Sequence, residues 1–322
     1  MAEQRVDSNK ASNAGNRFRP ICSICNGSER RFKAGRRVDR ATCSKCRTTE
    51  IFHNESQSDA AADSSQYWEK NGTDAFNTAL FARRVTQANQ FLDKFKDQLD
   101  LGSLDAKYMV DYGCGLGAMV AAAQQTGLLI FGSDVSLPVE ETAESQSWRN
   151  GRFIQLDHPW QQTDDRIQNA KCVFLLDVLE HHRTPSELID GFKGADCFVI
   201  KVPNARGPLS VLASRMFNLS ESLYGRLALV GDVAPHLWFF TSNGLDQLMA
   251  RSGFSPVGGL KLVEVGAEAG ARARSSVLGG LAFKTLSVPG ATLALLALIW
   301  SDAVFRVYWR SSVPLATWDV GV

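Results

Sequence analysis

Hydrophobic and polar positions change their period from block to block along the chain. Between residues 74 and 99 the apolar side chains recur every three or four positions, which is the spacing of one helix face. Further along, short apolar and β-branched runs take turns with stretches at helical spacing. These blocks predict strands over 108–112, 128–133, 153–156, 172–176, 197–202 and 255–265, and helices over 116–125, 185–192 and 241–252. Alternating strands and helices indicate an α/β fold, with a mostly parallel sheet covered by helices on both faces.

The segments outside this pattern differ in composition. Residues 1–20 are polar and rich in charge, and they predict a disordered tail. Residues 54–73 have the composition of a linker. The catalytic domain is therefore predicted over 74–268, and residues 203–235 show helical patches typical of a lid. Residues 269–322 predict an apolar helical extension of this domain.

Within that extension, residues 286–300 are nearly uncharged. The run spans fifteen residues and contains Pro289 and Gly290, whereas a membrane span needs about 20 apolar residues. We therefore expect a buried helix, a contact with a second copy of the chain, or a helix on a membrane surface. The stretch at 313–320 predicts a weak edge strand.

The chain's net charge of +1 conceals an uneven distribution. Residues 1–50 hold twelve basic and five acidic side chains, a surplus of +7 that leaves −6 for the rest. Such a surplus is typical of a solvated tail or of a module that meets an acidic partner, either nucleic acid or a membrane surface. Seven cysteines and a polar first segment indicate a reducing compartment, so we expect a cytoplasmic protein with a possible membrane association.

Four of the cysteines form two pairs in residues 21–53, each with two residues between its members. Seventeen residues separate the pairs, which is the spacing of a zinc ribbon. Thirty residues cannot build their own core, so the metal supplies the folding energy. Four protein ligands leave no open position, which makes this zinc structural, with redox pairs as the alternative. The predicted ligands are Cys22, Cys25, Cys43 and Cys46.

A glycine-rich loop follows the strand at 108–112. In open parallel sheets ligands bind at the carboxyl ends of strands, and glycines let the backbone approach them closely. The candidate residues are Gly113, Gly115 and Gly117. Gly113, Gly115 and Ala118 also satisfy a relaxed dinucleotide fingerprint with Asp134 downstream, so a nicotinamide enzyme is an alternative.

Three carboxylates lie at the ends of three successive predicted strands. Asp111 can receive the ammonium group of an amino-acid ligand, Asp134 the hydroxyls of a ribose, and Asp157 the amino group of an adenine. Three acids suit a neutral nucleoside with an amino-acid tail and would repel a pyrophosphate. The alternative is that these carboxylates only cap helices.

In their order and spacing these motifs resemble class I S-adenosylmethionine-dependent methyltransferases. The resemblance covers about residues 65–265 and rests on VDYGCGLGA, FGSDVS, FIQLD, LLDVLEHHRTP, IKVPN and HLWFFTSNGLDQLMARSGF. It implies a Rossmann-like domain that binds S-adenosylmethionine, with Asp177 of the DVLEH motif beside the donor. The subfamily that is most similar includes ubiquinone-type O-methyltransferases and bacterial enzymes for sugars and small metabolites. The apolar segment at 286–300 departs from the usual compact ending.

Methyl transfer to oxygen benefits from a base near neutral pH, which points to histidine. The chain has only five histidines. His181 follows the fourth predicted strand and His236 precedes WFF, so both are candidate catalytic residues with Glu180. Asp177, Glu180 and His181 are spaced to share one helical face, where they could bind a divalent cation such as Mg²⁺ and acidify an acceptor hydroxyl. Alternatively, they hydrogen-bond the donor loop and orient it, and His236 is structural.

Two classes of function follow from these features. The first is a small-molecule or glycan methyltransferase, most simply an O-methyltransferase, whose ribbon shapes the acceptor site. The second is a nucleic-acid-directed methyltransferase whose basic ribbon binds phosphates, although only Phe18, Phe32 and Phe52 offer rings for stacking there. An inactive scaffold is disfavoured because all the donor-site acids are present.

Overall fold

A computed structural model of the chain describes the predicted catalytic core and most of the ribbon. The described residues are 21–35, 38–53, 74–95, 109–135, 152–158, 160–207, 236–260 and 303–311, with short helical pieces at 210–211 and 214. The predicted tail at 1–20, the linker at 54–73, the segments at 286–300 and 313–320, and most of the lid lie outside them. No helix among the described residues is long and apolar enough to cross a membrane.

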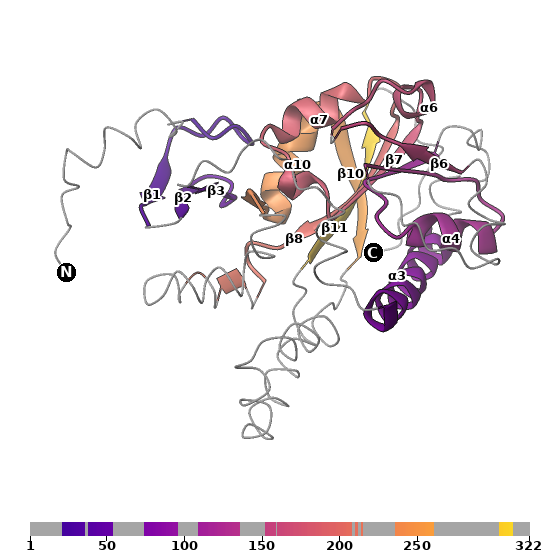
Figure 1. Cartoon of the computed structure of the whole chain (residues 1–322). Coiled ribbons are helices and arrows are strands. Elements are labelled where there is room, and N and C mark those ends of the chain that lie inside the picture. Colours follow the sequence, from indigo (N-terminus) through magenta and orange to yellow (C-terminus); the bar gives the residue numbers. More distant parts are fainter. Residues whose placement is uncertain are drawn as a thin grey trace, which may run out of the picture.

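A seven-stranded sheet forms the centre of the catalytic domain, in the order β10-β11-β8-β7-β4-β5-β6 (Figure 1). Neighbouring strands from β8 to β6 are parallel, whereas β11 is antiparallel to both β8 and β10. The parallel part confirms the Rossmann-like α/β fold predicted from the alternating pattern. The strands are β4 (Met109–Tyr112), β5 (Phe131–Asp134), β6 (Phe153–Gln155), β7 (Cys172–Leu176), β8 (Cys197–Pro203), β10 (Phe254–Leu260) and β11 (Ala303–Arg310).

Helices cover both faces of this sheet, as the alternation of side chains along the strands requires. Met109 of β4 packs with Phe91 and Met119, from α3 (Asp74–Phe95) and α4 (Ala118–Gln125). The next residue, Val110, belongs to the core on the opposite face. That face is covered by α7 (Pro185–Gly191) and α10 (Ser242–Arg251). Two short helices complete the described elements of the domain, α6 (Asp165–Gln168) and the 3-10 helix η2 (Leu179–His181).

Strand β11 corrects the prediction for the C-terminal part. We expected residues 269–322 to form a helical extension and the domain to end at 268, but Ala303–Arg310 forms a strand inside the sheet. Its sequence, AVFRVYWR, is rich in β-branched and aromatic residues, and most of these side chains are buried. The strands that pair with β11 lie far away in the sequence, so no local pattern predicts the pairing.

The ribbon is not a separate module, because the catalytic chain completes its sheet. Strands β1 (Arg30–Lys33), β2 (Val38–Cys43) and β3 (Thr49–His53) pair antiparallel, and β9 (Trp238–Phe239) pairs with β3 as the fourth strand. Thr241, which caps α10, donates a hydrogen bond to the carbonyl of Cys46 at 2.5 Å. Arg251 at the other end of α10 donates to the carbonyls of Ser23 and Ile24.

Gly244 of α10 lies against the ribbon and gives a test of this junction. A Cβ atom at Gly244 would lie 2.0 Å from the Oγ1 of buried Thr48. We predict that Gly244→Ala lowers the free energy of unfolding by about 1–3 kcal/mol through overpacking, as measured by denaturant titration. In a Thr48→Ala background the loss should shrink, because the clashing oxygen is gone. Equal losses in both backgrounds would contradict the described junction.

Candidate active site

The predicted glycine loop connects β4 to α4 at the carboxyl edge of the parallel strands. Its three glycines have left-handed φ angles of 73°, 51° and 76° at Gly113, Gly115 and Gly117. A Cβ atom at Gly113 would lie 2.6 Å from the Cγ2 of Val178, which follows β7. Only glycine therefore lets the loop pack this closely against the neighbouring strand end.

Two of the predicted acids lie beside this loop. Asp134 accepts a hydrogen bond of 2.8 Å from the N–H of Gly115, so its carboxylate fixes the loop. The side chain of Asp111 is buried, and this burial, followed by the charge of Asp134, raises its pKa to about 7. The Arg84 guanidinium opposes the increase in the pKa of Asp111. A cation bound next to Asp111 would restore its ionised form.

Asp111 lines a cavity that also holds three charged residues from other elements. Lys201 of β8 donates a hydrogen bond of 2.8 Å to Asp177, and Arg84 of α3 lies 3.7 Å from the same carboxylate. Burial acts to raise the pKa of Asp177, but Lys201 and Arg84 outweigh it and hold that pKa at about 2. From the described residues, the cavity therefore offers two carboxylates and two cations. Sequence reasoning missed Arg84 and Lys201, although their places on the helix before β4 and in IKVPN could have suggested them.

The third predicted acid, Asp157, comes two residues after the end of β6, the strand that pairs with β5. It is exposed after β6, and its backbone N–H donates a hydrogen bond of 2.8 Å to the side chain of Gln161. It is not among the described residues that line the cavity with Asp111 and Asp177. Its predicted contact with an adenine therefore stays a prediction.

The predicted catalytic residues form a cluster next to this cavity. Glu180 of η2 has a fully buried side chain, and one of its oxygens lies 3.9 Å from the Nε2 of His236. The rings of His181 and His236 are 4.9 Å apart between centroids. One ligand atom from each of the three residues lies within 4.8 Å of the others.

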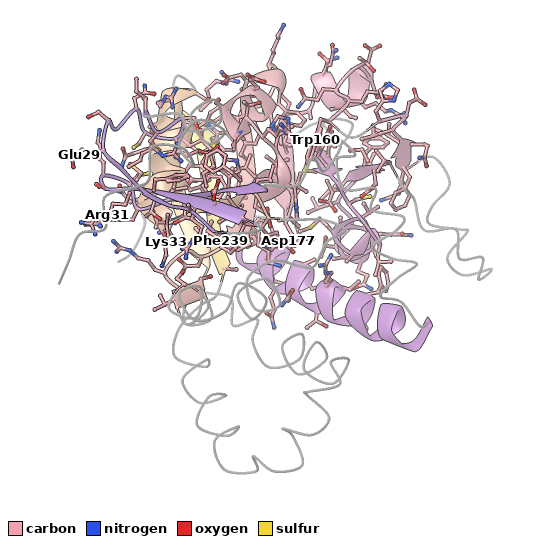
Figure 2. All side chains as sticks on the ribbon, turned by 60° about the vertical axis from the view of Figure 1, so that its left-hand side comes forward. Glu29, Arg31, Lys33, Trp160, Asp177 and Phe239 are labelled. Carbon is pink, nitrogen blue, oxygen red and sulfur yellow. The ribbon has the colours of Figure 1, made fainter. Side chains whose placement is uncertain are left out.

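This cluster corrects the predicted grouping of Asp177, Glu180 and His181. Asp177 has a left-handed φ of 60°, and the turn after it is a 3-10 helix, so the three residues do not share one α-helical face. Asp177, which is labelled in Figure 2, instead pairs with Lys201 in the cavity. The third member of the cluster, beside Glu180 and His181, is His236, which is far away in the sequence.

His236 is held in place by the residue that follows it. The N–H of Leu237 donates to the carbonyl of Glu180, and its carbonyl accepts from Ile51 of β3, both at 2.8 Å. Trp238 donates a hydrogen bond of 2.9 Å from its indole to the carbonyl of His182. The ribbon is thereby connected to the candidate catalytic cluster by main-chain hydrogen bonds.

The cluster can act chemically in two ways. A buried carboxylate beside an imidazole is suited to orient the ring and to stabilise it when it takes a proton. Two imidazoles and one carboxylate also suit a divalent transition metal, whereas Mg²⁺ prefers oxygen ligands. The predicted Mg²⁺ therefore has little support in the ligand set.

The four ribbon cysteines form a second cluster. Their sulfur atoms lie within 4.8 Å of one another and all four residues are buried. The Cys22–Cys46 and Cys25–Cys43 sulfurs are 3.8 and 3.5 Å apart. A tetrahedron with Zn–S bonds of about 2.3 Å has edges of about 3.8 Å, so the cluster fits a four-thiolate zinc site. A hydrogen bond from Cys46 lowers the pKa of Cys22 to about 5.

The sequence of residues 81–257 matches the family described as Methyltransferase domain, and this match spans more than half of the 322 residues. No curated protein matches the chain at a significant level.

Several solved structures share a remote likeness. Magnesium protoporphyrin IX methyltransferase from Synechocystis PCC 6803, with bound SAH, is 16% identical, with 77% of this chain and 100% of that chain covered and a TM-score of 0.45. Burkholderia thailandensis 1,6-didemethyltoxoflavin-N1-methyltransferase is 12% identical, with 88% and 100% covered and a TM-score of 0.47.

The cysteine cluster leads to a prediction about metal content. Elemental analysis should find about one zinc per chain, and Cys22→Ser or Cys46→Ser should lose it, because thiolates are the ligands. Ser23→Ala, next to the first ligand, is the matched control and should keep the metal. A folded wild-type protein without bound metal would contradict the zinc site.

Proposed function

Because the chain belongs to the methyltransferase domain family, and is therefore an S-adenosylmethionine-dependent methyltransferase, we propose that it methylates a hydroxyl of a small-molecule or glycan acceptor. This proposal rests on the contact between buried Glu180 and His236. Glu180 lies three residues after Asp177, which lines the cavity. This contact puts a candidate base beside the candidate donor cavity.

The charges of the cavity support S-adenosylmethionine as its ligand. The amino-acid tail of the donor is a zwitterion, so it needs one carboxylate and at least one cation in the protein. Asp111 would pair with its ammonium group, and Arg84 and Lys201 are the cations available for its carboxylate. Asp177 would balance these cations when the donor is absent.

The nucleoside would extend from the cavity along the strand ends. In the proposed complex the loop of Gly113, Gly115 and Gly117 approaches the donor, and Asp134 accepts hydrogen bonds from the ribose hydroxyls. Asp157 would accept from the adenine amino group. A nicotinamide dinucleotide fits poorly, since its pyrophosphate would meet the buried carboxylate of Asp111.

The proposed reaction is an in-line displacement at the methyl carbon. The acceptor oxygen forms the new O–C bond while the C–S bond breaks, and the sulfonium becomes a neutral thioether. The hydroxyl proton moves to the imidazole of His236. The charge of Glu180 stabilises the resulting imidazolium, and His181 packs against the same ring.

A second candidate role for the cluster is to bind a divalent cation of the zinc or manganese class. Glu180, His181 and His236 offer three converging ligand atoms for it. Such an ion would supply a positive charge that acidifies the acceptor hydroxyl.

The alternative acceptor class is nucleic acid, which the basic ribbon favours. Contact with a membrane or with a second copy of the chain through 286–300 stays a prediction.

The donor assignment predicts that Asp134→Ala weakens S-adenosylmethionine binding about a hundredfold or more in calorimetry. The variant loses the acceptor for the ribose and the hydrogen bond that fixes Gly115. Asp165→Ala removes an exposed carboxylate elsewhere and should bind normally. An unchanged affinity of Asp134→Ala for S-adenosylmethionine, or saturable binding of NAD instead, would contradict the donor assignment.

The raised pKa of Asp111 predicts how donor affinity depends on pH. The folded carboxyl has a pKa of about 7, above its ordinary value of 3.8, so it is mostly protonated in the free protein below pH 7. Only the ionised carboxylate pairs with an ammonium group, so S-adenosylhomocysteine affinity should fall as pH drops from 8 to 6, by at most about tenfold per pH unit. Asp111→Asn should bind weakly with a flat profile. An equally steep profile in that variant would show that another group titrates.

The base assignment is tested with an acceptor found by screening small hydroxylated compounds and glycans with labelled donor. His236→Ala should lower kcat about 10²–10⁴-fold while donor affinity changes little. Glu180→Gln should lower kcat less, because the imidazole is still present. The metal alternative predicts a second metal ion per chain, lost in His236→Ala but retained in His158→Ala. Full activity of His236→Ala would remove this residue from the mechanism.

A further inference from the structure

The 3-10 helix η2 carries two members of the candidate catalytic cluster, Glu180 and His181, and it ends at His181. The last carbonyl groups of a helix have no partner within that helix, so they are bound by groups from elsewhere. At η2 two donors come from the chain next to β9. The Leu237 N–H donates to the carbonyl of Glu180 at 2.8 Å, and the Trp238 indole donates to the carbonyl of His182 at 2.9 Å.

These two hydrogen bonds lie on either side of His181 along the chain. One reaches the carbonyl of the residue before it, and the other reaches the carbonyl of the residue after it. Both donors follow directly after His236, the third member of the cluster. The two stretches that carry the cluster are therefore joined at two points, and His181 and His236 belong to the joined part.

The indole of Trp238 is held in a fixed direction by the core around it. Its side chain is 1% exposed, and its ring lies 6.1 Å from that of Phe240, with 29° between the two planes. Both rings belong to the same core as the ribbon cysteines, among them Cys43 and Cys46. A buried ring in a close-packed core has few other rotamers available, so its N–H keeps its direction.

The main chain of Trp238 takes its place from the ribbon. In the register of β3 and β9, Trp238 lies opposite Glu50, and the next residue, Phe239, lies opposite Thr49. The Glu50 carboxylate in turn accepts a hydrogen bond of 2.6 Å from Arg30 of β1. Trp238 thus combines a backbone that belongs to the ribbon sheet with a side chain that binds the loop after η2.

His182, the residue that the indole binds, is also held through its side chain. Its Nδ1 accepts a hydrogen bond of 3.1 Å from the N–H of Thr184. The ring of Trp160 lies edge to face with the His182 ring, 4.8 Å away between centroids. Since residue 182 is bound at both its side chain and its carbonyl, the direction of the preceding residue, His181, is restricted. The ring of His181 lies 4.9 Å from that of His236.

We propose that Trp238 is a positioning residue for methyl transfer. Its indole N–H, acting through the carbonyl of His182, holds the end of η2 so that Glu180 and His181 face His236. This inference rests on the proposed function, because it takes these three residues as the reaction centre. It applies equally to a base and to a bound divalent cation, since both need the same three side chains to converge. Trp238 is buried, so it acts through the cluster.

The test compares two substitutions in the same pair of stacked rings. Trp238→Phe keeps an aromatic ring and removes the N–H donor, so kcat with the acceptor found by screening should fall about tenfold or more. The KM of the acceptor and the affinity for S-adenosylhomocysteine should change less than about twofold. Phe240→Leu disturbs the other ring but leaves the hydrogen bond in place, and its kcat should stay within about twofold of the wild type. An unchanged kcat in Trp238→Phe, or equal losses in both variants, would overturn the proposal.

A double-variant cycle separates positioning from a general loss of structure. In a His236→Ala background, Trp238→Phe should change the residual kcat less than about twofold, because the imidazole to be positioned is gone. The same loss in both backgrounds would show that Trp238 acts on the fold as a whole, and would overturn the proposal while leaving the proposed function intact. Full activity of His236→Ala alone would instead reject the proposed function.

Hydrogen exchange tests the proposal without turnover. In the wild type the indole N–H of Trp238 should be protected, and free exchange there would overturn the proposal even if the variants do not fold. In Trp238→Phe the Leu237 amide should exchange about tenfold faster or more, while the amides of Met109–Tyr112 keep their rates. Equal acceleration at both places would contradict a local role. Zinc content should stay the same in every variant, which shows that the ribbon is intact.

Discussion

Leu237 joins the ribbon to the catalytic domain through both of its main-chain polar groups. Its carbonyl accepts a hydrogen bond from the N–H of Ile51 in β3, and its N–H donates a hydrogen bond to the carbonyl of Glu180. A backbone held from both sides leaves little freedom to the residue before it, and that residue is His236. The place of the candidate base therefore depends on a ribbon whose own folding is predicted to need a metal. The arrangement explains how a short cysteine-rich segment can influence chemistry at the edge of a distant sheet.

On the donor side, neighbouring charges determine the pKa values of two buried carboxyl groups. Asp111 and Asp177 are both buried at the cavity, but their pKa values move in opposite directions, to about 7 and about 2. The difference comes from Lys201, which bonds to Asp177 directly and leaves Asp111 without comparable compensation. We therefore propose that the cavity receives a ligand that brings its own positive charge to Asp111. That asymmetry is what favours an amino-acid tail over a phosphate group in this cavity.

Local patterns in the sequence predicted the elements and the loop that are defined by neighbours along the chain. The strand at 172–176 and the glycine-rich loop after 108–112 are such features, since both follow from residues that are neighbours along the chain. The features that were missed depend on contacts between distant segments. Strand β11 pairs across a long separation, and His236 joins Glu180 only because β9 completes the ribbon sheet. Spacing alone suggested Asp177 for that place, and the backbone conformation after β7 rules it out.

The claim that the ribbon positions the candidate catalytic cluster is tested most directly by hydrogen exchange at the Leu237 amide. Exchange is measured in the metal-loaded protein, after removal of the metal by a chelator, and after zinc is restored, with the amides of Met109–Tyr112 in the sheet centre as reference. We expect metal removal to release the Leu237 amide while the reference amides stay protected, and zinc to reverse the change. Continued protection of Leu237 without metal, or equal loss of protection at the reference strand, would contradict the account.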